Sequence, residues 1–178
     1  MAQLRPLPID PLAEAKRQWL AHGWTDAADG MAVVTSVMRA QQLLLARVDA
    51  ALKPFGVTFA RFEVLRLLAF SRSGTLPLSS VVARLQVHAT SVTSTAERLV
   101  RDGLVLREPH PHDGRAAMLT LTDAGRALVE KATAALNAEV FSAPGINSDD
   151  AAALVGIVAR LRKDAGDFAD PRPTPDPL

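Results

Sequence analysis

The sequence predicts a mainly α-helical fold with a small β wing, and three observations carry this prediction. Apolar residues recur at spacings of three and four over most of the 178-residue chain, which is the period of amphipathic helices. The run Gly103-Leu104-Val105-Leu106 begins a short strand, and residues 116–121 supply a return strand. Between Leu76 and Gly125 the predicted order is therefore strand, helix, turn, helix, hairpin, which is the order of a winged helix-turn-helix domain.

An arm and a short helix are expected in residues 1–24. Asp10 can cap a helix that has Pro11 at its first position, and His22-Gly23 can end it.

Residues 25–56 are expected to form a long dimerisation helix that ends near Pro54. One of its stripes carries Met31, Val34, Met38, Gln41, Leu45, Val48 and Leu52. A helix of this length is about 40 Å long, which is more than one small domain can cover. A partner helix is therefore expected against this stripe.

The winged helix-turn-helix domain is expected over residues 57–121. Thr58 can cap a helix over about 59–71, and Ser79 can cap a second over about 80–86. A short strand is expected near Leu76–Leu78. The third helix, over about 89–102, has Val92, Ala96 and Leu99 on its buried stripe and Gly103 as its C-cap. Wing strands are expected at Leu104–Glu108 and Ala116–Leu121.

Two further dimerisation helices are expected over residues 122–168. The first begins at Thr122-Asp123-Ala124-Gly125 and runs to about Phe141, and the second begins at Ser148-Asp149-Asp150. Residues 169–178 contain four prolines and are expected to form a flexible tail. Because apolar stripes at both ends of the chain need a packing partner, a second copy of the chain is the simplest expectation.

Composition narrows the possible functions. The net charge is +1, but residues 57–121 hold eight arginines against five acidic residues, which suits contact with phosphates. The absence of cysteine excludes disulfides, thiol switches and Cys-ligated metals. Phosphate loops, nucleophile elbows and metal-binding His/acid helices are also missing from the sequence, so we expect no enzyme, no cofactor and no metal. No segment matches a signal peptide or a membrane span, so a cytoplasmic location without membrane contact is expected.

The segment Ala83–Gly125 resembles the MarR family of bacterial transcription regulators. ARLQVHATSVTSTAERLVRDGLV resembles the family's helix-turn-helix, which ends in Leu-x-x-x-Gly-Leu-Val. Pro111-His112-Asp113-Gly114-Arg115-Ala116 is similar to the family's wing signature, Asp-x-Arg-Ala. Leu119-Thr120-Leu121-Thr122-Asp123-Ala124-Gly125 resembles the Leu-Thr-x-x-Gly motif that follows the wing. The resemblance implies a homodimer with interlocking terminal helices, a pseudo-palindromic DNA operator and, often, a small organic effector bound between dimer helices and winged domain. Gly114 departs from the family, which often has a basic residue there.

Double-stranded DNA is the expected partner, and the candidate contacts lie on the exposed face of the third helix and on the wing. Short hydroxyls can approach phosphates or base edges, and a guanidinium suits the minor groove. A Ser/Thr-rich segment is also typical of capping and solvation, and Arg115 can instead pair with Asp113 to stiffen the loop. The candidates are His88, Thr90, Ser91, Thr93, Ser94, Arg98, Asp113 and Arg115.

Candidate effector contacts come from segments that could line the family's cleft. They are Trp19, Trp24, Met38, Arg39, Gln42, Phe62 and Arg66. The tryptophans can equally be core residues of the N-terminal extension, and either arginine can pair with an acidic effector or lie on the surface. The expected function is a homodimeric transcriptional repressor that a small molecule releases from its operator. The alternatives are a DNA-binding regulator with no small-molecule ligand and a winged-helix interaction module.

Overall fold

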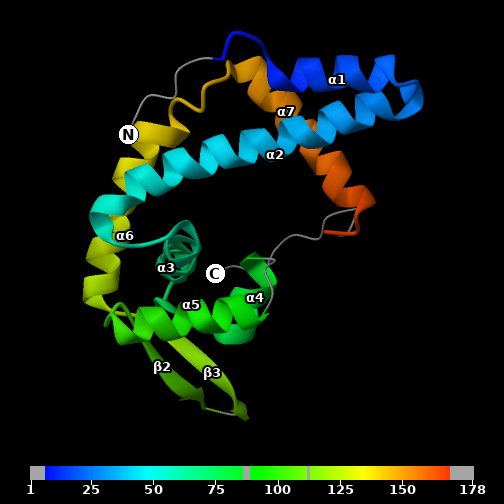
Figure 1. Ribbon diagram of the computed structural model, residues 1–178. Coiled ribbons are helices and arrows are strands. Elements are labelled where there is room, and N and C mark those ends of the chain that lie inside the picture. The colour runs from blue at the N-terminus through cyan, green and yellow to red at the C-terminus, as the bar shows by residue number, and fades with distance from the viewer. Residues whose placement is uncertain (1–6, 86–88, 112, 169–178) are drawn as a thin grey trace. The chain divides into compact units, whose positions relative to one another are not determined.

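The computed structural model describes residues 7–85, 89–111 and 113–168, and it confirms the predicted fold class (Figure 1). Helices account for most of these residues, and one three-stranded antiparallel sheet completes the fold. By its internal contacts the chain divides into two compact units, one up to Arg47 and the other from Val48 onward. The division falls inside one long helix. None of the helices in the described ranges has the length and apolarity that crossing a membrane requires.

The first unit contains α1 (Pro11–Ala21) and most of α2 (Thr25–Leu52). The Asp10 carboxylate accepts a hydrogen bond from the Leu12 backbone N–H at 2.9 Å, so the predicted cap is present. The chain then turns, and α1 folds back over the start of α2 (Figure 1). Lys16 and Asp29 form an ion pair of 2.6 Å between the two helices. Ala28, with 1% of its surface exposed, is buried in this unit.

The second unit begins with the last turn of α2 and contains the predicted winged domain. Its elements are η1 (Lys53–Phe55), α3 (Phe59–Phe70), β1 (Thr75–Pro77), α4 (Leu78–Leu85), α5 (Ala89–Arg101), β2 (Val105–His110), β3 (Asp113–Leu121), α6 (Asp123–Leu136), the π-helical η2 (Asn137–Phe141) and α7 (Ser148–Asp164).

The start of α4 and the bounds of both wing strands differ from the sequence-based expectation. Helix α4 begins at Leu78, so Ser79 lies in its first turn and does not cap it. Helix α7 begins at Ser148, as expected, and Asn147 caps it by accepting a hydrogen bond from the Asp150 backbone N–H at 2.8 Å. Both hairpin strands extend further toward the turn than expected, because backbone pairing continues past the apolar residues that were used to place them.

The sheet has the order β1-β3-β2, and its inner face packs on the helices. Leu76 pairs with Leu119, and Val105 pairs with Leu121. These four side chains join one hydrophobic core with residues of the helices: Val64, Leu65 and Leu68 of α3, Val81 of α4, Val92, Ala96 and Leu99 of α5, and Val129, Ala132 and Leu136 of α6. The core predicted for the third helix is therefore present.

Close packing at Gly125 joins the wing to α6. A Cβ atom placed there would lie 2.1 Å from the carbonyl oxygen of Leu104, so no side chain fits without a backbone shift. The Thr122 hydroxyl caps α6 by accepting from the Gly125 N–H at 3.0 Å, and it donates to the Gly103 carbonyl at 2.9 Å. The glycine and threonine of this motif thus set where α6 starts relative to the end of α5.

Candidate nucleic-acid interface

Helix α5 has one buried face and one polar face. Val92, Ala96 and Leu99 are at most 2% exposed, on the side of the helix that packs against α3, α4 and β2. Thr90, Ser91, Ser94 and Arg98 are exposed on the other face, and Thr93 is half-buried on its flank. The hydroxyl of Ser94 donates to the Ser91 carbonyl at 3.1 Å. Four predicted DNA-contact residues therefore share one solvent-facing surface.

Arg101 also belongs to this exposed surface, and sequence reasoning left it out. It follows Ser94 by seven residues and Arg98 by three, so it continues the same stripe of the helix. Counting the polar stripe forward to the last turn of α5 would have included it. Its charge adds to that of Arg98 near the C-terminal end of the helix.

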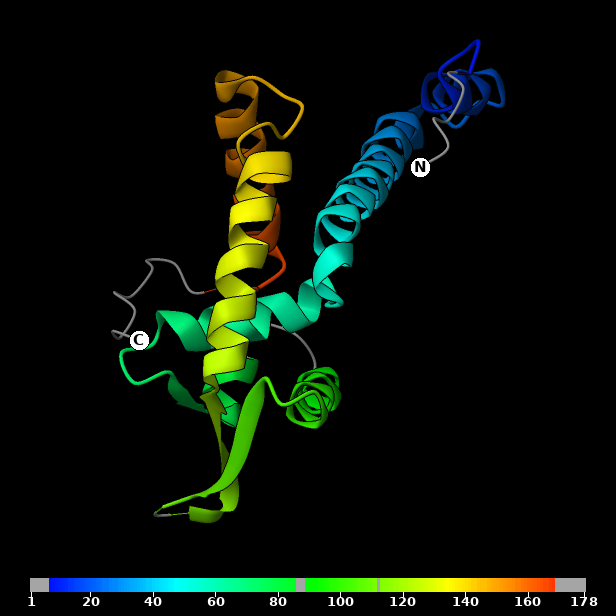
Figure 2. The same ribbon diagram turned by 90° about the vertical axis from the view of Figure 1, so that its left-hand side faces the viewer.

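The wing is the β2–β3 hairpin, which extends beyond helices α3 to α5 (Figures 1 and 2). Pro109 pairs with Ala117 and His110 with Asp113, so residues 114–116 form a bulge in β3. Arg115 therefore lies, by its backbone, at the bulge near the tip of the hairpin. The side chains of Asp113 and Arg115, and the whole of His88, lie outside what the structure describes. Glu97 of α5 and Arg107 of β2 approach to 4.0 Å and link helix to wing.

The effector candidates of the first unit are Trp19, Trp24, Met38, Arg39 and Gln42. The rings of Trp19 and Trp24 meet edge to face at 5.2 Å, and His22 stacks on Trp24 at 5.4 Å. The two tryptophans therefore pack on each other within this unit, although Trp24 remains 53% exposed. Arg39 donates a hydrogen bond to the Gln42 side chain at 3.1 Å, and both are exposed.

The two effector candidates on α3 are engaged in internal contacts. Phe62 is 6% exposed and belongs to the hydrophobic core. Arg66 donates to the Val129 carbonyl at 3.1 Å and to the Thr133 hydroxyl at 2.7 Å, and it pairs with Glu130 at 3.1 Å. Its guanidinium also lies over the ring of Phe70. Arg66 thus ties α3 to α6 and is not the free surface residue that the sequence allowed.

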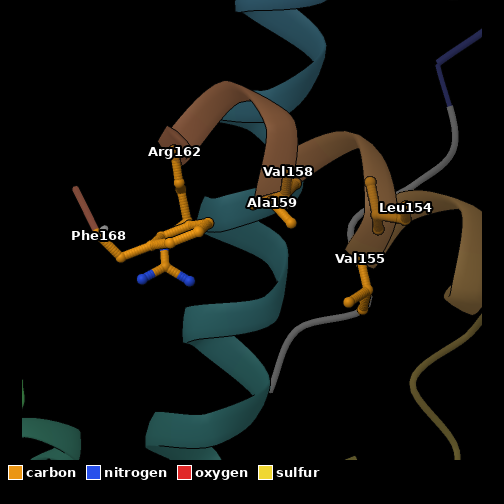
Figure 3. A pocket seen from close by; sticks show the side chains of 6 residues that line it. All are labelled: Leu154, Val155, Val158, Ala159, Arg162 and Phe168. Carbon is orange, nitrogen blue, oxygen red and sulfur yellow. The ribbon is translucent and has the colours of Figure 1, made fainter. Parts of the chain in front are cut away.

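A shallow hollow of about 530 Å³ lies on α7, in a place that the sequence did not indicate (Figure 3). Leu154, Val155, Val158 and Ala159 form its apolar side, and Arg162 and Phe168 border it at the other end. The guanidinium of Arg162 lies over the Phe168 ring at 5.5 Å. All six residues come from α7 and the segment directly after it, so the hollow is a feature of one helix face.

Among the described residues, no cluster of three His, Asp or Glu side chains could hold a metal ion.

Comparison with known sequences identifies the segment that contains helices α3 to α5 and most of the wing. Residues 55–116 match the sequence profile described as "MarR family". The chain is 33% identical over 100 residues to the HTH-type transcriptional repressor Rv2887 of Mycobacterium tuberculosis. This match covers 56% of this chain and 70% of that protein. It is also 33% identical over 84 residues to the uncharacterized HTH-type transcriptional regulator YhbI of Bacillus subtilis. That match covers 47% of this chain and 53% of YhbI, about half of its length.

Solved structures extend the likeness to most of this chain and to nearly the whole of the related chains. Sco5413, a MarR family transcriptional regulator from Streptomyces coelicolor, is 48% identical, with a TM-score of 0.71 over 80% of this chain and 99% of its own. BpsR of Bordetella bronchiseptica, whose DNA binding is regulated by 6-hydroxynicotinic acid, is 28% identical, with a TM-score of 0.65 over 72% of this chain and 91% of its own. Proteins of this family are DNA-binding regulators and not enzymes. The winged helix with its polar α5 face therefore belongs to a member of the MarR family of transcriptional regulators.

Proposed function

We propose that this protein is a homodimeric repressor that binds a pseudo-palindromic operator and is released from it by a small organic molecule. The polar face of α5 carries the proposal. Thr90, Ser91, Ser94 and Arg98 are exposed together, while the opposite face of the helix is locked into the core. A helix held in this way can enter the major groove and present hydroxyls and a guanidinium to base edges.

The roles of helix and wing differ in this proposal. His88, Thr90, Ser91, Thr93, Ser94 and Arg98 act in or beside the major groove, and Arg101 reaches a phosphate at the groove's edge. Arg115 and Asp113 belong to the wing tip, where an arginine suits the narrow minor groove. Phosphate contacts position the protein, whereas contacts to base edges select the sequence.

Dimerisation is proposed because the terminal helices carry exposed apolar residues. Val34 and Met38 of α2 are 57% and 56% exposed, and Val155 and Leu161 of α7 are 69% and 62% exposed. Apolar surface of this extent is typical of a protein–protein interface. A second copy would cover it and would also place two α5 helices for two half-sites of a palindrome.

Release by an effector is supported by the relative BpsR, whose DNA binding responds to 6-hydroxynicotinic acid. For this chain, Trp19, Trp24, Met38, Arg39 and Gln42 remain the candidate contacts, with an aromatic or acidic molecule as the chemical class they suit. The internal contacts of Phe62 and Arg66 favour the alternative of a regulator with no small-molecule ligand. A winged-helix interaction module is the remaining alternative.

Fluorescence anisotropy with the DNA that flanks the gene tests this function. A labelled inverted repeat from that region should bind in the nanomolar range, and binding should weaken steeply as salt rises because counterions are released from phosphates. A scrambled duplex of equal length is the control. Equal affinity for both duplexes would contradict an operator-specific regulator, and no binding to either would favour the interaction module.

Thermal unfolding in the presence of a set of aromatic acids separates a regulator with a small-molecule effector from a regulator without one. A ligand that binds the folded protein raises its melting temperature.

A further inference from the structure

Arg61 of α3 joins two segments that are far apart in the sequence. Its Nη1 donates a hydrogen bond to the Gly56 carbonyl oxygen at 3.2 Å, and its Nη2 forms an ion pair with the Asp102 carboxylate. Gly56 ends the turn that follows α2, and Asp102 directly follows the last residue of α5. One guanidinium therefore connects the turn after α2 to the C-terminal end of α5, the helix that carries the candidate base contacts.

The environment of Arg61 makes this connection stiff. Its side chain is only 13% exposed, and its buried Nε has no hydrogen-bond partner among the described residues. A cation so removed from water depends on a nearby anion, and Asp102 supplies it. The Asp102 backbone N–H donates to the Arg98 carbonyl at 3.0 Å, so the carboxylate is attached to the last turn of α5.

The position of the C-terminal end of α5 affects where its N-terminal turn, which carries Thr90, points. Helix α5 has 13 residues, and at 1.5 Å per residue it is about 20 Å long. A rotation of about 5° around its C-terminal end would move its first turn, and with it Thr90, by about 2 Å, which is more than a hydrogen bond tolerates. Contacts to base edges would be lost, whereas the attraction between arginines and phosphates would persist.

We propose that Arg61, acting through Asp102, is a positioning residue for DNA recognition: it holds α5 at the angle that base reading requires. The inference rests on the proposed function. It assigns to Arg61 no contact with DNA, and it predicts that loss of the ion pair reduces discrimination between DNA sequences more than it reduces DNA binding as such.

The chain provides a matched control on the same helix. Arg66 of α3 is 15% exposed, has a buried Nε without a described partner, and pairs with Glu130 of α6 at 3.1 Å. Asp102→Asn and Glu130→Gln each remove the negatively charged partner of one arginine of α3. Asp102 holds α5, whereas Glu130 holds α6. A general loss of stability or a general change in charge should therefore appear in both variants.

The test measures affinity for the inverted repeat and for a scrambled duplex, at a temperature where circular dichroism shows every variant folded. Asp102→Asn should bind the inverted repeat about three- to tenfold more weakly while its affinity for the scrambled duplex stays equal or rises. Loss of a negative charge alone would raise both affinities, so a fall for the specific duplex identifies positioning. Glu130→Gln should keep the wild-type ratio.

The double variant Arg61→Asp with Asp102→Arg, which restores an ion pair of reversed polarity, should recover part of the ratio. An unchanged ratio in Asp102→Asn, or an equal fall in Glu130→Gln, would overturn the inference while leaving the proposed function intact. A wild-type protein that does not distinguish the two duplexes would overturn the proposed function first.

Discussion

The winged domain and the terminal helices use their apolar residues in opposite ways. Leu65, Leu99 and Leu119 have no exposed surface, because helices α3 to α6 and the sheet close around them. Helix α7 has no buried residue over its 17 positions, and Val155 and Leu161 are more than half exposed. The first region therefore completes its core within one chain, whereas the second presents surface that another molecule can cover.

The difference shows that the spacing of apolar residues predicts a helix but does not identify the surface that covers its apolar face. Both regions have apolar residues at helical spacing, and in both the spacing predicts helices correctly. Only in the winged domain are there neighbouring elements on several sides to bury the stripe. A stripe thus indicates a helix with a partner, but the identity of the partner depends on tertiary or quaternary structure.

Removal of residues 142–178 should have the largest effect on this comparison. If α7 completes a dimer, the shortened chain should be a monomer in light scattering and should bind the inverted repeat about 100-fold more weakly, since two half-sites are no longer engaged together. The winged domain should stay folded because its core ends at Val140. A shortened chain that still has twice its monomer mass would place the dimer interface elsewhere.

Leu99→Ala and Leu161→Ala compare a closed core with an open helix face. Leu99→Ala leaves a cavity in the core, so it should lower the free energy of unfolding by about 2–5 kcal/mol. Leu161→Ala should lower the melting temperature only through the dimer, so its effect should depend on protein concentration. Thermal unfolding at several protein concentrations measures both. A concentration-independent effect of Leu161→Ala would mean that α7 packs within its own chain.

Ser94→Ala and Arg115→Ala compare the two parts of the proposed DNA-binding surface, helix α5 and the wing. Ser94→Ala should cost about 1–3 kcal/mol of discrimination among operator variants if its hydroxyl reads a base edge. Arg115→Ala should weaken binding to all duplexes alike and reduce the slope of affinity against salt by about one charge. Affinity measured over a range of salt concentrations separates these effects. An unchanged slope together with a lower melting temperature in Arg115→Ala would assign this residue to stiffening of the wing.

Glu63→Gln should have the smallest effect and concerns the edge of the closed core. Burial raises the pKa of Glu63 above its ordinary value, so the folded protein holds its proton more tightly than the unfolded chain does. Stability from this proton is present below the unfolded pKa and is lost as pH rises through the folded pKa. Glu63→Gln should therefore raise the melting temperature at neutral pH and lose this advantage in acid. Equal shifts at both pH values would contradict the assignment.

Most of the fold could be predicted because its signals are local. Asp10 and Thr58 cap their helices as expected, and Thr122 caps the helix that was expected to begin at its motif. Each cap needs only a side chain two or three residues before the amide that donates to it. The start of α4 was misplaced because Ser79 is typical of a helix cap in sequence, whereas the helix begins at Leu78, directly after β1. The exposed face of α5 could be predicted from the spacing of Val92, Ala96 and Leu99, which also fixes the opposite face.

The sequence by itself determined the order of elements, the buried stripe of α5 and the motif that joins wing to α6, because these follow from residue spacing and backbone geometry. Only the tertiary structure decided which groups each arginine of α3 contacts. Arg61 meets Asp102 across 41 residues, and Arg66 meets Thr133 across 67. An arginine's neighbours in space depend on how helices are packed, and its charge is equally compatible with solvent, a phosphate or a buried carboxylate until that packing is known.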